Sequence, residues 1–289
     1  MPVWEIETEG AGRMQVAVLS GKGGTGKTTV STNLAKIMGC RYVDCDVEEP
    51  NGFIFLKPKI EETREVYILV PSIDKEKCSD CKKCVDICQF NALVHTKQGV
   101  MLFEKLCHGC GACTLICQTK AIIEARRRIG KIDIGKHGDI ECLSGTLNIG
   151  EPMAGPVISQ LKNLIDDKTT IVDCSPGSSC NVVKAVQGAD YAILVTEPTA
   201  FGLHDLKIAV ELVKKINIPF SIIINRVTGD ENLITRYCYE KNIPILGLIP
   251  YDKKIAIFYS EGKLLVEDET YKNIFKSIAR TLMEAVQCS

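Results

Sequence analysis

The feature that most restricts the fold is a cysteine pattern that occurs twice near the middle of the chain. Eight of the 15 cysteines follow the spacing C-x2-C-x2-C-x3-C in two successive copies. The copies comprise Cys78, Cys81, Cys84 and Cys88, followed by Cys107, Cys110, Cys113 and Cys117. Residues 73–123 around them contain too few aliphatic side chains for a hydrophobic core, so this segment is expected to need bound cofactors to fold. The copies also resemble each other beyond the cysteines, which indicates a duplication.

A glycine-rich loop lies upstream of the cysteines. It follows the β-branched run Met14–Ser20 and precedes Thr28–Met38, which carries apolar residues at helical spacing. The loop fits G-x4-G-K-T, the P-loop pattern, whose backbone N–H groups hold phosphates while Lys27 neutralises their charge and Thr28 binds Mg2+. We expect ATP or ADP with Mg2+ here, although a glycine-rich turn can match the pattern by chance. The expected nucleotide-binding residues are Gly21, Gly23, Gly24, Thr25, Gly26, Lys27, Thr28 and Thr29.

The rest of the chain alternates short apolar runs with segments of helical periodicity. This alternation predicts an α/β fold with a doubly wound, mostly parallel sheet. Expected strands are Arg41–Val43, Thr169–Val172, Tyr191–Val195, Phe220–Ile224 and Ile245–Ile249. We also expect a short strand at Glu65–Val70 that Pro71 ends, and an antiparallel hairpin within Ile129–Ile149. The amphipathic segment Tyr271–Val286 has the spacing of a helix packed on a core, and the alternative is a membrane-targeting helix.

Composition excludes several classes of protein. The net charge of −1 provides no global field to attract nucleic acid or an anionic membrane. No apolar run approaches the roughly 18 residues of a spanning helix, and no secretory signal opens the chain. The cysteine spacing fits metal binding better than disulfides. We therefore expect a cytoplasmic protein with no nucleic-acid partner and no membrane span.

These patterns divide the chain into four segments. Residues 1–13 are interpreted as a leader or added extension, and 14–72 as the first part of a P-loop ATPase domain. Residues 73–123 form the inserted cysteine-rich domain, and 124–289 the second part of the ATPase domain. Because the insert begins after Asp46 and ends before Asp173, we expect both attachment points in the nucleotide half of the sheet, with a short mechanical route between the two sites.

The loop contains an additional lysine, Lys22, in the sequence Lys22-Gly-Gly-Thr-Gly-Lys-Thr. This version resembles the deviant Walker A motif of the MinD/ParA/Mrp class of P-loop ATPases. The resemblance implies that Lys22 acts in trans, stabilising charge at the nucleotide of a partner subunit, and that Lys27 is also catalytic. It further implies that Asp46, beside Asp44, is the switch I aspartate that orients the attacking water.

Two further residues match positions of that class. Asp173 closes an apolar strand, as a Walker B carboxylate does, and would bind Mg2+ through water. Asn225 ends the strand Ser221–Asn225 and matches the asparagine that contacts adenine. Purely structural roles stay open, since Asp46 and Asp173 can cap strand ends and Asn225 can cap a turn.

The cysteine runs resemble those of two-cluster bacterial ferredoxins, in which the fourth cysteine of each run binds the other cluster. The insert would then be a small α+β ferredoxin-like domain with two [4Fe–4S] clusters. The implied ligand sets are Cys78, Cys81, Cys84 and Cys117 for the first cluster, and Cys107, Cys110, Cys113 and Cys88 for the second. Paired structural zinc sites are the alternative, but they normally show separate C-x2-C knuckles.

Seven cysteines remain, and their default interpretation is burial as small hydrophobic residues. They are Cys40, Cys45, Cys142, Cys174, Cys180, Cys238 and Cys288. Cys45 stands between two aspartates, and Cys174 and Cys180 bracket the loop after Asp173. A transient cluster or a redox-sensitive switch is the alternative at these three positions.

As a whole the chain resembles MinD-superfamily ATPases with an inserted ferredoxin domain. The segments Glu197-Pro-Thr-Ala-Phe-Gly-Leu-His-Asp205 and Ile249-Pro-Tyr-Asp252 also match. The resemblance implies a homodimer or a heterodimer with a paralogous subunit, and a redox or metallocofactor-carrier partner. Three functions fit: an ATP-gated electron carrier, an Fe–S or metallocofactor assembly ATPase, and a positioning ATPase with clusters as redox sensor. The complete ferredoxin ligand set favours the first, since a delivery scaffold needs labile ligation.

Overall fold

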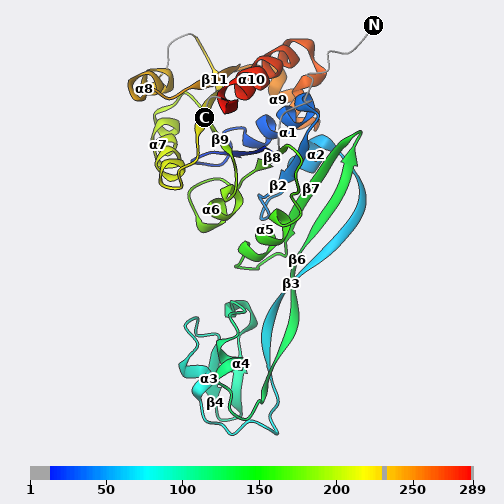
Figure 1. Ribbon diagram of the computed structural model, residues 1–289, viewed down its shortest axis with the longest axis vertical. Helices are drawn as coiled ribbons and strands as arrows, with labels where there is room; N and C mark the ends of the chain where they lie inside the picture. The colour runs from blue at the N-terminus through cyan, green and yellow to red at the C-terminus, as the bar shows by residue number, and fades with distance from the viewer. Residues whose placement is uncertain (1–13, 230–232, 288–289) are drawn as a thin grey trace.

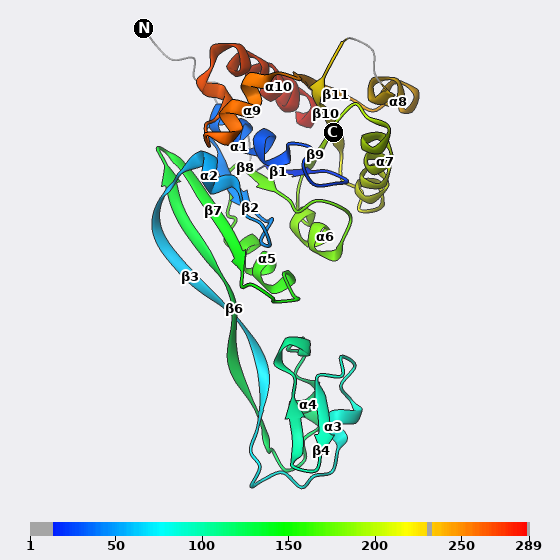
Figure 2. The same cartoon turned by 180° about the vertical axis from the view of Figure 1, so that it is seen from behind.

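The molecule consists of two parts joined by a long two-stranded ribbon (Figures 1 and 2). The computed structural model describes residues 14–229 and 233–287, so the expected leader 1–13 and Cys288 lie outside the described residues. The larger part, here called the body, is a sheet with helices on both faces. The smaller part, here called the cysteine-rich unit, comprises residues 74–121 and lies at the far end of the ribbon.

Within the described residues, nine strands form one sheet in the order β11-β10-β9-β1-β8-β2-β7-β6-β3. The strands from β11 to β7 in this order are mutually parallel. They are β11 Ile245–Pro250, β10 Phe220–Val227, β9 Tyr191–Thr196, β1 Gln15–Leu19, β8 Thr170–Asp173, β2 Arg41–Asp44 and β7 Ile140–Leu147. The central strands β1, β8, β2 and β9 are buried along their whole length, as their continuous apolar sequences require. The predicted α/β fold with a mostly parallel sheet is confirmed.

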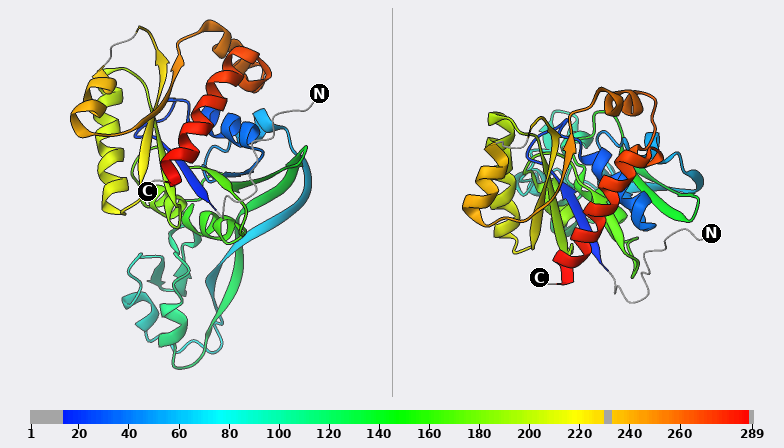
Figure 3. Two further views of the ribbon diagram at one scale, coloured as in Figure 1. Left: turned by 45° about the horizontal axis from the view of Figure 1, so that its top comes forward. Right: turned by 90° about the horizontal axis from the view of Figure 1, so that it is seen from above.

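Helices cover both faces of this sheet, which makes it doubly wound (Figure 3). One face carries α1 Lys27–Met38, α2 Gly52–Leu56, α9 Lys253–Ser260 and α10 Glu269–Gln287. The other face carries α5 Gly155–Lys162, α6 Cys180–Val186, α7 Ala200–Lys215 and α8 Leu233–Lys241. Because α10 buries Phe275, Ile278 and Leu282 in the core, the prediction of a packed helix is confirmed. In the part of the chain that the structure describes, no helix has the length and apolar character needed to cross a membrane.

The ribbon consists of β3 Lys59–Ile73 and β6 Ile122–His137, which pair antiparallel. The 15 residues of β3 span up to roughly 50 Å at about 3.3 Å per residue. Since β6 also pairs antiparallel with β7, the predicted hairpin is confirmed. The predicted end of a strand at Pro71 is wrong, because β3 continues to Ile73. An edge strand accepts proline, since alternate N–H groups there point away from the partner strand.

The cysteine-rich unit is built from short elements joined by tight loops. These are α3 Lys83–Asp86, β4 Leu93–Thr96, β5 Gly99–Leu102, the 3-10 helix η1 Glu104–Leu106 and α4 Ala112–Ile116. Both connections to the body run through β3 and β6, at one edge of the sheet. The expectation that they join the nucleotide half is therefore wrong, because β8, β2 and β7 separate β6 from β1. The β6–β7 hairpin, which follows the unit in sequence, lies between β2 and β3 in the sheet.

Candidate functional site

The loop between β1 and α1 has the backbone that its glycines predict. Gly24 and Gly26 have φ of 77° and 96°, in the left-handed region that favours glycine. A Cβ on Gly21 would lie 2.1 Å from the backbone oxygen of Asp205, so only glycine fits there. Asn225 braces the loop, because its Nδ2 donates a hydrogen bond to the backbone oxygen of Thr25 at 2.8 Å.

A cleft opens at the carboxyl ends of the parallel strands, next to this loop. The predicted residues that line it are Gly23, Gly24, Gly26, Lys27, Thr28, Thr29, Asp46 and Asn225. The predicted residues Gly21, Lys22, Thr25 and Asp173 lie outside its lining. Sequence reasoning missed the residues of the opposite wall, which include Arg226, Tyr251, Asp252 and Tyr259. Two of them, Tyr251 and Asp252, lie in the segment Ile249–Asp252, whose match to the family could have indicated them.

Two buried aspartates lie side by side at the ends of β2 and β8. Asp44 is paired in register with Asp173, and their exposed fractions are 1% and 0%. Burial, and then the charge of Asp173, raise the pKa of Asp44 well above its usual range. Asp44 Oδ1 accepts a hydrogen bond from the Asp46 N–H at 3.1 Å, and its Oδ2 accepts one from the Gly52 N–H at 2.9 Å. Asp44 thus fixes the segment that carries Asp46.

Asp173 has the environment of a residue that faces a cation. Its Oδ1 is buried and has no hydrogen-bond partner among the described residues. Burial raises the pKa of Asp173, whereas nearby Lys27 and Thr28 favour its charged form. A buried carboxylate oxygen without a partner is costly, and a bound Mg2+ or its water would satisfy it. The side chains of Thr28 and Asp173 therefore fit the expected Mg2+.

Asp46 faces the same cleft from the segment after β2. Burial, opposed by the charge of Lys27, raises its pKa to about 6. The side chain is therefore mostly ionised at neutral pH and can accept a hydrogen bond from water. This chemistry suits the predicted orientation of an attacking water.

Lys22 is engaged within its own chain. Its Nζ forms an ion pair with Glu197 Oε1, and Glu197 Oε2 also accepts a hydrogen bond from Arg226 Nη1 at 3.0 Å. The Lys22 side chain remains 34% exposed. Its role toward a partner subunit stays a prediction.

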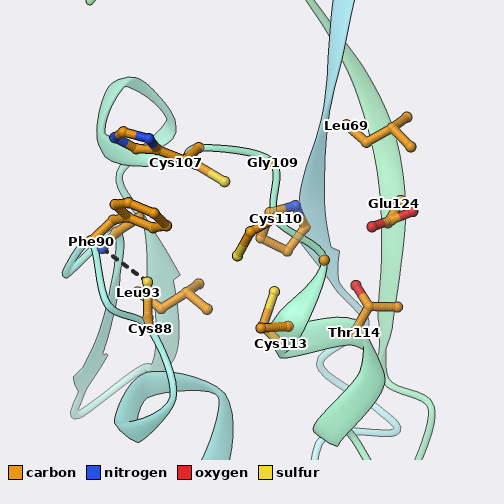
Figure 4. A pocket seen from close by; sticks show the side chains of 15 residues that line it. Leu69, Cys88, Phe90, Leu93, Cys107, Gly109, Cys110, Cys113, Thr114 and Glu124 are labelled. Carbon is orange, nitrogen blue, oxygen red and sulfur yellow. Dashed lines mark hydrogen bonds between the residues drawn. The ribbon is translucent and has the colours of Figure 1, made fainter. Parts of the chain in front are cut away.

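Four of the eight cysteines face one cavity in the cysteine-rich unit (Figure 4). They are Cys88, Cys107, Cys110 and Cys113, which is the ligand set implied for the second cluster. Leu69 and Glu124 of the ribbon complete the wall, and the Ala92 N–H donates a hydrogen bond to Cys88 Sγ at 3.3 Å. The fourth cysteine of one run thus lines the same cavity as three cysteines of the other.

The other four cysteines do not line this cavity. Cys84 and Cys117 belong to one apolar cluster, and Cys78 contributes, after burial and Cys113, to the raised pKa of Cys84. Cys81 is exposed. Within residues 14–229 and 233–287, no group of three or more His, Cys, Asp or Glu side chains has a geometry that could hold a metal ion. Binding of clusters at either set stays a prediction.

The remaining cysteines of the body are buried, with one correction. Burial is confirmed for Cys40, Cys45, Cys142, Cys174 and Cys238. The expectation is wrong for Cys180, which is exposed because it begins α6 at the surface. Burial raises the pKa of Cys45 to about 12, so little reactive thiolate exists there at neutral pH.

Comparison with known proteins agrees with this geometry. A family model described as the CobQ/CobB/MinD/ParA nucleotide binding domain matches residues 16–266. The chain belongs to this family. The match runs from β1 to the residues before α10 and so includes the P-loop and the segments that carry Asp46, Asp173 and Asn225.

Individual members of the family extend the comparison. MJ0579 of Methanocaldococcus jannaschii is 34% identical over 278 residues, which cover 93% of this chain and 98% of the relative. The iron–sulfur cluster carrier protein of Pyrococcus horikoshii is 24% identical over 317 residues, covering 97% and 89%. The structure of MinD with Mg-ADP from Pyrococcus horikoshii has a TM-score of 0.57 at 20% identity and covers 93% of this chain and 95% of that one. The last similarity shows a shared fold.

Proposed function

We propose that the protein is a Mg2+-dependent ATPase in which nucleotide-driven rearrangement of a dimer controls electron transfer through two [4Fe–4S] clusters. The observation that carries this proposal is a cavity lined by Cys88 of one run and by Cys107, Cys110 and Cys113 of the other. A [4Fe–4S] cluster supplies reversible uptake of one electron. The second set, Cys78, Cys81, Cys84 and Cys117, would hold the other cluster.

The cleft supports the hydrolytic half of the proposal. Lys27 and the loop N–H groups would hold the β- and γ-phosphates, while Thr28 and Asp173 would hold Mg2+. Asp46 would orient a water whose oxygen bonds to the γ-phosphorus as the bond to the bridging oxygen breaks. The products are ADP and phosphate. Lys22 would leave Glu197 and act on the nucleotide of the second subunit.

A continuous apolar contact supports coupling between the two halves. Cys107 and Ala92 of the cysteine-rich unit belong to the same cluster of buried side chains as Val157 of α5 and Cys174, the residue after Asp173. The contact passes along Val66, Ile68 and Val70 of β3. The unit thus shares a cluster of buried side chains with the body by way of the ribbon strand β3.

A close approach of the Lys105 side chain to Gly150 lies next to this apolar contact. A Cβ built on Gly150, in the loop between β7 and α5, would lie 3.0 Å from Lys105 Nζ. Lys105 is two residues before Cys107, and Gly150 precedes the helix α5, which packs on α6. A movement of α5 and α6 when the loop after Asp173 changes would therefore reach the loop that carries Cys107.

The test is a redox titration of the anaerobic protein with clusters in place. We expect Mg–ATP to change the cluster midpoint potentials, or the rate at which dithionite-reduced protein passes electrons to a one-electron acceptor dye. Mg–ADP and the Lys27→Ala variant serve as controls. Potentials and rates that do not respond to Mg–ATP would reject the coupling.

A second candidate function has a specific observation in its favour. The similarity to an iron–sulfur cluster carrier protein favours an ATPase that delivers clusters to other proteins. The same preparation distinguishes the two functions when it is mixed with an apo-ferredoxin acceptor. Loss of clusters to the acceptor on addition of Mg–ATP would favour delivery, whereas retained clusters with altered potentials would favour electron transfer.

A further inference from the structure

Tyr42 occupies an unusual position between the two buried aspartates. It lies on β2 two residues before Asp44, so the two side chains point to the same face of the sheet. Its exposed fraction is 0%, and its hydroxyl donates a hydrogen bond to Asp173 Oδ2 at 3.1 Å. Asp44 lies close enough to interact with the same hydroxyl. A tyrosine hydroxyl on a Walker B carboxylate has no role in the function described so far.

The surrounding backbone makes room for this hydroxyl. A Cβ on Gly52, the first residue of α2, would lie 2.0 Å from Tyr42 Oη. Gly52 also donates its N–H to Asp44 Oδ2. The hydroxyl is therefore held from one side by the strand that ends in Asp173 and from the other by the segment that follows Asp46.

We propose that Tyr42 is a positioning residue for Mg2+, because its hydroxyl occupies Oδ2 of Asp173 and leaves Oδ1 as the oxygen that serves the metal. This role rests on the proposed Mg–nucleotide site. Two observations carry it: Oδ2 has a buried donor, and Oδ1 is buried with no hydrogen-bond partner among the described residues. Hydrogen bonds that orient a metal-binding side chain contribute roughly tenfold or more to metal affinity.

A Tyr42→Phe variant separates this role from simple core packing, since it keeps the ring and removes the hydroxyl. Tyr191→Phe is the matched control. Tyr191 lies on β9, is 2% exposed, and also loses a buried hydroxyl contact, the one with Ser221. That contact lies outside the cleft lining.

The measurement is a titration of ADP-loaded protein with Mn2+ at room temperature, following the free-ion signal by electron paramagnetic resonance. Tyr42→Phe is expected to weaken Mn2+ binding about tenfold, while Tyr191→Phe stays within about twofold of wild type. Affinity for ADP in EDTA should be unchanged in both variants. Gly52→Ala, which would displace the hydroxyl, should reproduce the loss of Mn2+ affinity and serves if Tyr42→Phe does not fold.

Wild-type Mn2+ affinity in folded Tyr42→Phe protein would overturn the positioning role, even if the melting temperature falls. Equal losses in Tyr42→Phe and Tyr191→Phe would also overturn it, because they would reflect general loosening of the core. Wild-type protein that binds ADP with no dependence on Mn2+ would instead overturn the proposed Mg–nucleotide site, and this role with it.

Discussion

The nucleotide cleft and the cysteine-rich unit differ in what holds their residues in place. The cleft is formed by strand ends in a sheet whose central strands are completely buried, and hydrogen bonds such as Asn225 to Thr25 fix its loop. In the unit, the buried side chains that pack together are few and include Cys84 and Cys113 themselves. We infer from this comparison that the cleft can form before its ligand binds, and we expect the unit to require a bound cofactor at its cysteines in order to fold.

The largest expected effect is unfolding of the cysteine-rich unit without loss of nucleotide binding in the cleft. Cys113→Ser should remove one cluster and increase proteolytic cleavage within residues 74–121 by about a hundredfold, because bound metal supplies much of the folding free energy of such a unit. Binding of ADP to the body should stay within about twofold. Cys180→Ser is the control, since Cys180 is an exposed cysteine of the body. Simultaneous loss of ADP binding would show that the two regions fold as one.

The second prediction concerns a substitution that stops hydrolysis in the cleft and leaves the cysteine-rich unit unchanged. Lys27→Ala should lower the rate of phosphate release by at least about a hundredfold, since the lysine neutralises charge that develops on the phosphates. The visible spectrum of the clusters should not change. Lys36→Ala, on the exposed side of the same helix α1, should keep wild-type hydrolysis. Normal phosphate release by Lys27→Ala would contradict the assignment of the loop.

The third prediction asks whether one cleft is complete without a second chain. Lys22→Ala and Asp46→Ala proteins should each hydrolyse ATP very slowly. An equal mixture should regain roughly a quarter of wild-type activity, because half of the dimers would contain one site with both groups intact. If Lys22 serves its own nucleotide, the mixture will be as slow as its components.

The fourth prediction concerns pH. Because the pKa of Asp46 is raised to about 6, the carboxylate takes up a proton below that pH. If this carboxylate orients the attacking water, as proposed, single-turnover phosphate release should fall about tenfold per pH unit. The same shift gives the native state more bound protons than the unfolded state between about pH 4 and 6, so this group stabilises the fold in acid. A melting curve at each pH distinguishes lost activity from unfolding. A rate that stays constant down to pH 5 would contradict the role of Asp46.

The smallest expected effect tests whether the contact between the cysteine-rich unit and the body carries coupling. Lys105→Ala should reduce the change in cluster potential that Mg–ATP causes by about twofold, while hydrolysis and the potential without nucleotide stay near wild type. Lys97→Ala is the control, since Lys97 is an exposed lysine in the turn between β4 and β5 of the same unit. Equal responses in both variants would show that the Lys105 contact carries no coupling.

Much of the body could be predicted because residues close together in sequence determine its loops, strands and helices. The glycines of the P-loop are required by backbone angles and by close contacts such as that between Gly21 and Asp205, and the buried parallel strands have continuous apolar sequences. Alternating segments were therefore enough for the sheet and its helices. The hairpin of β6 and β7 followed from alternation and glycine turns in the same way.

The remaining features depend on neighbours that are distant in sequence. The strand β3 passes Pro71 because it is an edge strand, which only the strand order reveals. Lys22 and Glu197 are 175 residues apart, and Tyr42 and Asp173 are 131 apart, so no local pattern could pair them. Arg127 and Glu151, which form an ion pair, are 24 residues apart.

The edge position of β3 has a consequence for how copies of the protein can meet. Within the described residues, β3 has a partner strand on one side only, so its outer side presents free backbone donors and acceptors to any passing strand. Charged, exposed side chains occupy most of its first half, including Glu61, Glu62 and Arg64. Such side chains discourage strand addition and aggregation along an open edge. These side chains therefore disfavour the pairing of two chains along this border of the sheet.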